Sequence, residues 1–174
     1  MTQLSGFEEG AFVIQDISSM LAVEALGLPK MDNQGTLKIL DICAAPGGKS
    51  MLAADILNHA DIDYMLEARD ISEYKVELMQ ENFNRCHLNK AKAVAWDALE
   101  PDERWLGQAD VVIADIPCSG LGVIGRKRDI KYKMTPQAVQ DIVELQEKIL
   151  KVAASYVKKG GKLLFSTCTV NKDE

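Results

Sequence analysis

The chain has 174 residues, of which 47% are hydrophobic and 26% charged, and its formal net charge at pH 7 is −6. This length predicts one domain over residues 1–174 with a sizeable hydrophobic core. The acidic balance argues against a surface that binds nucleic acid as a whole, because such binding needs a concentrated positive face. No apolar stretch has the length of a membrane span and no signal-peptide pattern opens the chain, so we expect a cytoplasmic protein.

Five short apolar runs predict the strands of a sheet. They lie at residues 37–42, 63–68, 91–96, 109–115 and 161–167. Helical patterns separate them, and a further helix is expected over 14–26, before the first run. This alternation predicts an α/β fold with a mostly parallel, doubly wound sheet.

Two of the helical patterns are clearly periodic. Apolar residues recur at three- and four-residue steps over 76–86 and over 138–156, so both helices are expected to cover the sheet. The second is expected to begin at Thr135 as the N-cap, with Pro136 in the first turn. Gly160 and Gly161 are expected to stop it.

A glycine-rich turn, DICAAPGGKS, follows the first predicted strand and opens a helix. Its glycines allow the backbone to approach a ligand closely. A phosphate-binding P-loop is disfavoured, since that pattern needs glycine where this chain has Cys43, and Pro46 removes an amide donor. The G-x-G-x-x-G spacing of dinucleotide-binding proteins is also missing. The turn therefore favours a cofactor that needs no phosphate cradle.

Acidic residues follow three of the predicted strands, namely Asp70, Asp97 and Asp115. Ligands of open α/β sheets collect beyond the carboxyl ends of the strands, where these side chains could meet a ribose or an adenine. A carboxylate after the second strand can accept hydrogen bonds from both ribose hydroxyls. Asp70 is therefore our strongest candidate for a cofactor contact.

Two cysteines close predicted strands: Cys118 in VVIADIPCSGLG and Cys168 in KLLFSTCTV. Thiols at the ends of two strands could face one cleft and support a two-thiol mechanism. Cys43 and Cys86 are expected to behave as small buried hydrophobes. No CxxC pair suits a structural zinc, and the two histidines lack a second ligand nearby in sequence, so no metal site is expected.

Four segments, in this order, resemble the NOL1/NOP2/Sun family of RNA cytosine-5 methyltransferases: FEEGAFVIQDISSMLAVEAL, DICAAPGGKS, DIPCSGLGVIGRKRDIKY and STCTVNKDE. The resemblance implies a Rossmann-like, S-adenosylmethionine-dependent methyltransferase fold and an RNA substrate, ribosomal RNA in particular. It implies Cys168 as the nucleophile and Cys118 as the residue that assists breakdown of the covalent adduct. Asp115 would hydrogen-bond ring nitrogen 3, which requires its carboxyl to be protonated, or would otherwise stabilise the activated ring. The implied cofactor contacts are Cys43, Ala44, Ala45, Pro46, Gly47, Gly48, Lys49, Asp70, Asp97 and Asp115.

These roles suit the chemistry of cytosine. Carbon 5 is not nucleophilic enough to attack a methyl sulfonium directly, so a thiolate must first add to carbon 6. A second group must then remove the proton from carbon 5 before the thiol can leave. The loop after the Cys118 motif adds a local cluster of positive charge, which includes Arg126, Lys127, Arg128 and Lys131. This cluster is either a contact for RNA phosphates or simply a solvated face.

Two alternatives stay open. In DNA cytosine-5 methyltransferases the nucleophile lies in the PC motif, so Cys118 would attack, although the STC segment and the QDISSM opening favour the RNA family. The second alternative is a domain that binds cofactor or RNA without turnover. The chain stops soon after Cys168, where the methyltransferase fold normally adds a helix and an antiparallel strand pair. We therefore expect a truncated carboxyl end and no RNA-binding domains.

Overall fold

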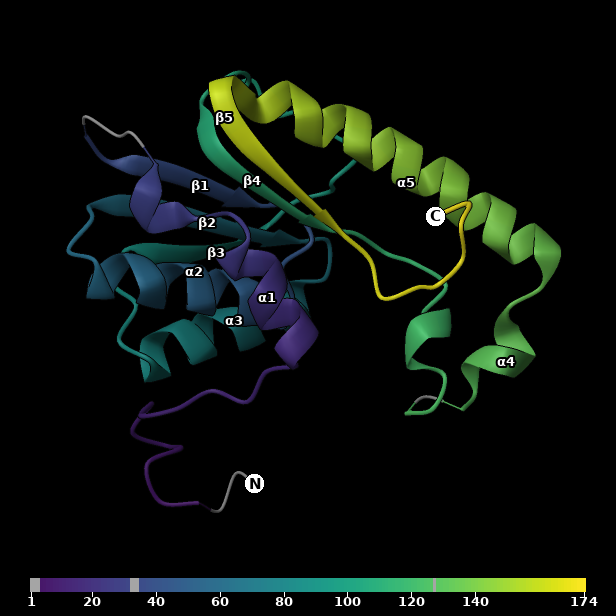
Figure 1. Ribbon diagram of the computed structural model, residues 1–174, viewed down its shortest axis with the longest axis horizontal. Helices are drawn as coiled ribbons and strands as arrows, with labels where there is room; N and C mark the ends of the chain where they lie inside the picture. The colour runs from purple at the N-terminus through teal and green to yellow at the C-terminus, as the bar shows by residue number, and fades with distance from the viewer. Residues whose placement is uncertain (1–3, 32–34, 127) are drawn as a thin grey trace.

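The structure, a computed structural model, describes residues 4–31, 35–126 and 128–174 (Figure 1). One five-stranded sheet has the order β3-β2-β1-β4-β5, and each pair of neighbours is parallel. The strands are β1 (Leu37–Asp41), β2 (Tyr64–Asp70), β3 (Ala91–Ala95), β4 (Ala109–Asp115) and β5 (Val157–Ser166). The predicted parallel sheet is confirmed.

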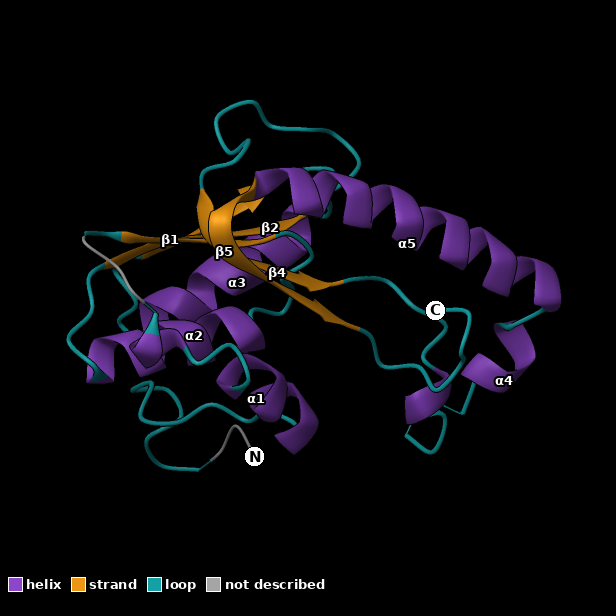
Figure 2. Cartoon of the chain, turned by 45° about the horizontal axis from the view of Figure 1, so that its top comes forward, coloured by secondary structure: helices purple, strands orange, loops and turns teal. Residues whose placement is uncertain are grey.

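Helices cover both faces of this sheet. They are α1 (Ile17–Glu24), α2 (Gly48–His59), α3 (Glu73–Arg85), α4 (Ile130–Lys133) and α5 (Pro136–Tyr156), with short 3-10 turns η1 (Leu28–Lys30) and η2 (Leu121–Val123). Figure 2 shows α1, α2 and α3 on one side and α5 on the other. The core is divided accordingly: Ile39 of β1 packs in one buried cluster and its neighbour Leu40 in the other, because alternate side chains of a strand point to opposite faces.

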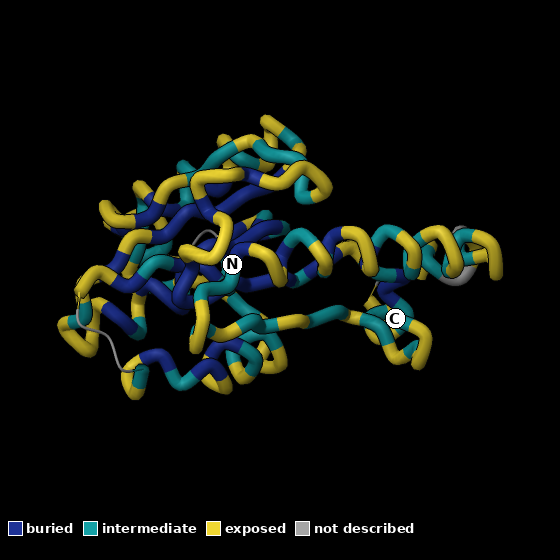
Figure 3. Tube along the Cα trace, turned by 90° about the horizontal axis from the view of Figure 1, so that it is seen from above, coloured by how far each residue is buried: buried dark blue, intermediate teal, exposed yellow. Residues whose placement is uncertain are grey.

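The boundaries of two predicted helices differ from the expectation. The first helix is shorter than 14–26, since α1 covers Ile17–Glu24. The start of α5 is as predicted: Thr135 caps it, its Oγ1 accepting a hydrogen bond from the Ala138 amide at 3.1 Å. Only the second half of α5 has buried side chains, beginning at Gln146, and the first half extends past the sheet (Figures 1 and 3). Coverage of the sheet by this helix therefore holds for its second half.

The predicted end of α5 is wrong. The helix stops at Tyr156, and Gly160 and Gly161 belong to β5. They lie where the register between β4 and β5 shifts. Gly160 has a φ of 82°, and a Cβ on Gly161 would lie 2.9 Å from the carbonyl oxygen of Asp110. The two glycines are required by the irregular start of this strand rather than by a helix end.

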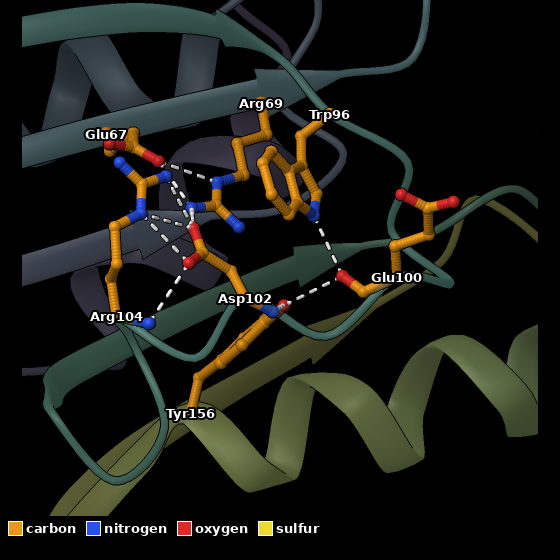
Figure 4. Close-up of polar contacts among 7 residues, drawn as sticks. All are labelled: Glu67, Arg69, Trp96, Glu100, Asp102, Arg104 and Tyr156. Carbon is orange, nitrogen blue, oxygen red and sulfur yellow. Dashed lines mark hydrogen bonds and ion pairs between the residues drawn. The ribbon is translucent and has the colours of Figure 1, made fainter.

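A buried charged cluster joins β2 to the loop that follows β3 (Figure 4). Arg69, only 1% exposed, donates from Nε to Glu67 at 2.7 Å and from Nη2 to Asp102 at 2.5 Å. The exposed Arg104 also donates to Asp102, at 2.6 Å. The Arg69 guanidinium lies 4.9 Å from the centroid of the Trp96 ring. The buried guanidinium is thus bonded to a carboxylate of β2 and to one of this loop, and it lies near an aromatic ring of the same loop.

The same loop is bonded to the end of α5. The Tyr156 hydroxyl accepts a hydrogen bond from the Asp102 amide at 2.9 Å and donates to the Glu100 carbonyl at 3.2 Å. The Trp96 indole donates to that carbonyl at 2.8 Å. Residues 96–105 are therefore held against β2 and α5 together. In the part of the chain that the structure describes, no helix is long and apolar enough to span a membrane.

Candidate active site

Most of the candidate residues meet at the carboxyl edge of the sheet. A cavity of about 450 Å³ opens there, and its lining includes Cys43, Asp70, Asp97, Asp115, Cys118 and Cys168. We call it the larger cavity. These residues come from the ends of β1, β2, β4 and β5 and from the loop after β3, so the strand order gathers segments that are distant in sequence.

The turn after β1 contributes only part of its residues to this cavity. Cys43 and Ala45 line it, whereas Pro46 is exposed and Lys49 lines a different cavity. Gly47 has a φ of 98°, and a Cβ there would lie 3.2 Å from the Phe83 ring. Glycine is therefore needed at this position for both conformation and space.

The turn offers few free amides to a phosphate. The Ala44 amide donates to the Arg69 carbonyl at 2.7 Å, and the Gly47 amide donates to the Ala44 carbonyl at 2.7 Å. Pro46 has no amide proton to give. This geometry supports the sequence argument against a P-loop, because those amides are already occupied within the protein.

Beneath the turn, burial changes the titration of two side chains. Burial, reinforced by nearby carboxylates, raises the pKa of the Cys43 thiol to about 12, which keeps it a neutral, inert thiol at pH 7. Burial likewise raises the pKa of Asp41 to about 7, against the hydrogen bond that it accepts from Ser50 at 2.7 Å. The bond between Asp41 at the end of β1 and Ser50 in α2 connects the two elements that flank the turn.

Asp70 and Asp97 face the larger cavity from neighbouring segments. Asp70 ends β2, is 8% exposed, and accepts a hydrogen bond from the Ser72 amide at 3.1 Å. The Nζ of Lys75 lies 3.4 Å from the Oδ1 of Asp70. Asp97 accepts from the Leu99 amide at 2.9 Å. Each carboxylate has about four acceptor sites, so these contacts leave capacity for a ligand in the cavity.

The two thiols predicted to share a cleft are in contact. The Sγ atoms of Cys118 and Cys168 are 3.1 Å apart, and the Cys168 amide lies 3.2 Å from the Sγ of Cys118. Burial and the hydrogen bond with Cys118 raise the pKa of Cys168 to about 11. Cys168 is therefore protonated at rest near pH 7, and a nucleophilic role requires that its proton be removed.

Asp115 ends β4 beside this pair but binds a residue expected to touch cofactor. Lys49 Nζ lies 2.5 Å from Asp115 Oδ2, and Ser166 Oγ lies 2.8 Å from its Oδ1. Lys49 also donates to Ser19 Oγ at 3.4 Å. The sequence had not predicted that Lys49 pairs with this carboxylate.

A second cavity, of about 260 Å³, lies on the other side of Asp115. Its lining includes Ser19, Lys49, Asp115, Ser166 and Cys168, and we call it the smaller cavity. Asp115 and Cys168 line both cavities. One carboxylate and one thiol therefore stand at the boundary between two spaces, which is the arrangement needed to bring two ligands together.

The positive loop is placed only in part. Arg126 forms an ion pair with Asp16, which precedes α1, and Arg128 is exposed. The backbone of Lys131 lies in α4. Lys127 lies outside the described residues. Among the residues that are described, no group of three His, Cys, Asp or Glu side chains is placed to hold a metal ion.

The sequence did not predict two residues that contact the loop around Cys118. Gln146 is 5% exposed on α5 and donates to the Pro117 carbonyl at 2.9 Å. Glu174 accepts from the Ser119 amide at 2.7 Å. A signal for Gln146 was present, because it lies four residues after Ile142 on the apolar side of an amphipathic helix.

The fold and its neighbours define a class of protein. The chain superposes on a "putative s-adenosyl-l-methionine-dependent methyltransferase" from Methanococcus maripaludis with a TM-score of 0.56 at 17% identity, over 86% of this chain and 54% of that one. The expected Rossmann-like methyltransferase fold is thereby confirmed. A closer structure, NSun6 from Pyrococcus horikoshii with SFG, an S-adenosylmethionine analogue, gives a TM-score of 0.81 at 28% identity, over 99% of this chain and 42% of that one.

The family follows from the sequence. The model of the family "16S rRNA methyltransferase RsmB/F" matches residues 28–174, and the chain belongs to this family. A "Probable ribosomal RNA small subunit methyltransferase B" of Bacillus subtilis (strain 168) is 40% identical over 169 residues, which are 97% of this chain and 36% of that protein. A "Ribosomal RNA small subunit methyltransferase B" of Photorhabdus laumondii is 37% identical over 100% of this chain. The chain spans 36% to 38% of these two relatives, so it is shorter than they are.

Proposed function

We propose that this chain is a catalytic segment that transfers a methyl group from S-adenosylmethionine to carbon 5 of a cytosine in RNA, with ribosomal RNA as the substrate. The observation that carries the proposal is the contact between the Cys118 and Cys168 thiols at the boundary of two cavities, 3.1 Å apart. Family membership supports RNA rather than DNA as the substrate. We also propose that the protein acts in the cytoplasm.

The larger cavity fits the cofactor. Its volume, about 450 Å³, lies in the usual range for ligand pockets, which is roughly 300–1,000 Å³. Asp70 would accept hydrogen bonds from the ribose hydroxyls, and Asp97 and the apolar Ile149 would border the rest of the molecule. Cys43 and Ala45 would allow a close approach from the turn. When bound, S-adenosylmethionine supplies an electrophilic methyl group.

The smaller cavity fits the base. Cytosine presents a donor in its exocyclic amino group and acceptors at ring nitrogen 3 and oxygen 2. Asp115 offers a carboxylate and Lys49 an ammonium at one edge of this cavity, with their polar atoms 2.5 Å apart. The pair therefore complements cytosine without a protonated Asp115, and the ammonium stabilises negative charge that develops on the ring.

Cys168 adds to carbon 6 through its sulfur. Its thiol first loses its proton to water, the new S–C6 bond forms, and the electrons of the C5–C6 double bond move to carbon 5 and into the ring. After carbon 5 has taken up the methyl group, Cys118 as a thiolate accepts the proton of carbon 5. The double bond then re-forms and Cys168 leaves as a thiolate. The proton that Cys118 has accepted can then pass across the 3.1 Å contact to the Cys168 sulfur, which restores its resting thiol.

The test is a pair of variants in the full-length enzyme with labelled S-adenosylmethionine and ribosomal RNA. Cys168→Ala should abolish both methyl transfer and covalent RNA attachment, whereas Cys118→Ala should let the adduct accumulate on a denaturing gel. Cys86→Ala is the matched control and should behave as the unchanged enzyme. An adduct formed by the Cys168 variant but not by the Cys118 variant would reverse the roles and favour DNA-type chemistry.

A negative result for turnover is also informative. If the unchanged full-length enzyme binds S-adenosylmethionine but methylates no RNA, the domain is a binding module. Mapping the labelled base then separates the remaining possibilities, because methyl on any atom other than carbon 5 of cytosine refutes the proposed reaction.

A further inference from the structure

Glu174 connects the two loops that carry the cysteines. Its Oε2 accepts a hydrogen bond from the Ser119 amide at 2.7 Å, and its Oε1 accepts from the Thr169 hydroxyl at 3.2 Å. Ser119 directly follows Cys118, and Thr169 directly follows Cys168. One carboxylate therefore bonds to the residue next to each thiol.

The two loops also touch one another at the same place. The Ser119 and Thr169 hydroxyl oxygens are 2.8 Å apart. The Gly122 amide donates to the Cys168 carbonyl at 3.0 Å, and a Cβ on Gly122 would lie 2.8 Å from that oxygen. The backbones of the Cys118 and Cys168 loops are thus in direct contact, in addition to their shared bonds with Glu174.

A third element closes the cluster. The buried Gln146 side chain donates to the Pro117 carbonyl at 2.9 Å and lies 3.4 Å from Glu174 Oε2. The Asn171 amide group donates to Glu174 Oε1 at 3.2 Å. Helix α5, the Cys118 loop and the Cys168 loop are therefore bonded through one side chain.

The chemistry of this cluster calls for a carboxylate. Four donors converge on Glu174, from Ser119, Thr169, Asn171 and Gln146, and an ionised carboxylate is an acceptor at both oxygens. Although burial opposes it, hydrogen bonds from Ser119, Asn171 and Thr169 lower the pKa of Glu174. An amide in its place would present an NH₂ group to some of these donors and leave them unpaired.

We propose that Glu174 is a positioning residue that holds the Cys118 and Cys168 loops at the spacing required for two-thiol methyl transfer. Glu174 does not line either cavity, so it acts through the loops rather than on substrate or cofactor. The proposal rests on the proposed function for its catalytic consequence, but its geometric consequence can be measured without RNA.

The catalytic test uses Glu174→Gln in the full-length enzyme, with Asp173→Asn as the matched control because that neighbouring carboxylate is exposed. A displacement of about 1 Å at reacting groups can cost about 100-fold. We expect kcat to fall about 10- to 100-fold with Glu174→Gln, with the KM for S-adenosylmethionine nearly unchanged and the enzyme still folded at the assay temperature. Glu174→Asp, which keeps the carboxylate, should recover part of the rate.

For Glu174→Gln itself, two results would overturn the proposal. One is an unchanged kcat in Glu174→Gln. The other is a loss of kcat in parallel with a loss of cofactor affinity or with unfolding at the assay temperature, which would indicate general destabilisation. An equal loss in Asp173→Asn would likewise show that the position of the carboxylate does not matter.

The geometric test needs neither RNA nor turnover. Diamide oxidises two thiols to a disulfide and is itself reduced to the hydrazine, with both thiol protons transferred to it. Peptide mass spectrometry measures how fast Cys118 and Cys168 pair. We expect Glu174→Gln to slow this pairing about tenfold, since misplaced loops lower the effective concentration of one thiol near the other. Equal pairing rates would refute the positioning role even if no RNA is methylated, and slowed pairing in an enzyme without methyl transfer would refute the proposed function alone.

Discussion

Replacing Asp102 with Asn tests whether the buried charged cluster stabilises the fold. Asp102 has a side chain that is 4% exposed, and it pairs with Arg69, whose side chain is 1% exposed. The substitution keeps the shape but leaves the Arg69 charge with Glu67 as its remaining acidic partner in the cluster. Breaking a buried pair by removing one partner costs about 3–5 kcal/mol. At about 2–4 °C per kcal/mol for a chain of this size, the melting temperature should fall by roughly 6–20 °C.

The effect should also depend on pH, with a definite sign. Hydrogen bonds from Arg104 and Arg69 outweigh burial and hold the pKa of Asp102 well below its ordinary value of 3.8. A lowered pKa in the folded state means that the carboxylate contributes stability in full above pH 4 or so, and that this contribution is lost as the pH falls further. The difference between Asp102→Asn and the unchanged chain should therefore be largest near neutral pH and shrink in acid.

The assay is thermal and urea unfolding followed by circular dichroism between pH 3 and pH 8, with Asp63→Asn as the control. Asp63 pairs with Lys90 at 2.7 Å, but their side chains are 58% and 49% exposed, so water screens that pair and little stability depends on it. If Asp102→Asn cost no more than Asp63→Asn, the cluster would not stabilise the fold. A cost that failed to decrease in acid would refute the charge-based reasoning.

Three further predictions concern the cavities and the sheet edge. Asp70→Asn should weaken S-adenosylmethionine binding, as measured by calorimetry, about 10- to 100-fold, since hydrogen bonds to charged groups contribute about 1.5–3 kcal/mol. Unchanged affinity would exclude the ribose contact. The rate of adduct formation, measured in a single turnover, should rise about tenfold per pH unit from pH 7 to 9. The reason is that the pKa of Cys168 is raised to about 11 and only the thiolate attacks. A plateau of this rate above pH 7 would contradict the prediction. Because β5 is an edge strand of the described sheet, the 174-residue chain should self-associate in sedimentation more than a version extended by its native continuation; equal monomer fractions would refute it.

The strands could be predicted because each one contains a short apolar run, and a run of this kind is a local property of the sequence. The N-cap of α5 was equally local, since Thr135 and Pro136 are adjacent. Gly160 and Gly161 were misinterpreted because a glycine pair after a helix usually marks its end. Here they serve a register shift against β4, and that depends on a partner strand about 50 residues away.

The contact between Cys118 and Cys168 could be predicted in outline for a related reason. Both follow strands, and parallel strands end at the same edge of a sheet. The direct neighbours β4 and β5 bring the sulfurs to 3.1 Å. The buried Arg69 pairs with Asp102, 33 residues further along the chain. No periodic pattern encodes which acidic residue a buried arginine will meet, so this cluster was not predictable.

Lys49 shows how a motif can mislead about a residue's surroundings. Its turn was recognised as a cofactor turn, and Cys43 and Ala45 do border the larger cavity. Lys49, however, lies in the first turn of α2, so its side chain points away from them and meets Asp115 in the smaller cavity. One short segment thus contributes to two adjoining spaces, with backbone and small side chains on the side proposed for the cofactor and an ammonium on the side proposed for the base. Under the proposed function, a charge placed there would act on the ring that accepts the methyl group, which would explain why a lysine is useful in a turn whose cofactor needs no phosphate cradle.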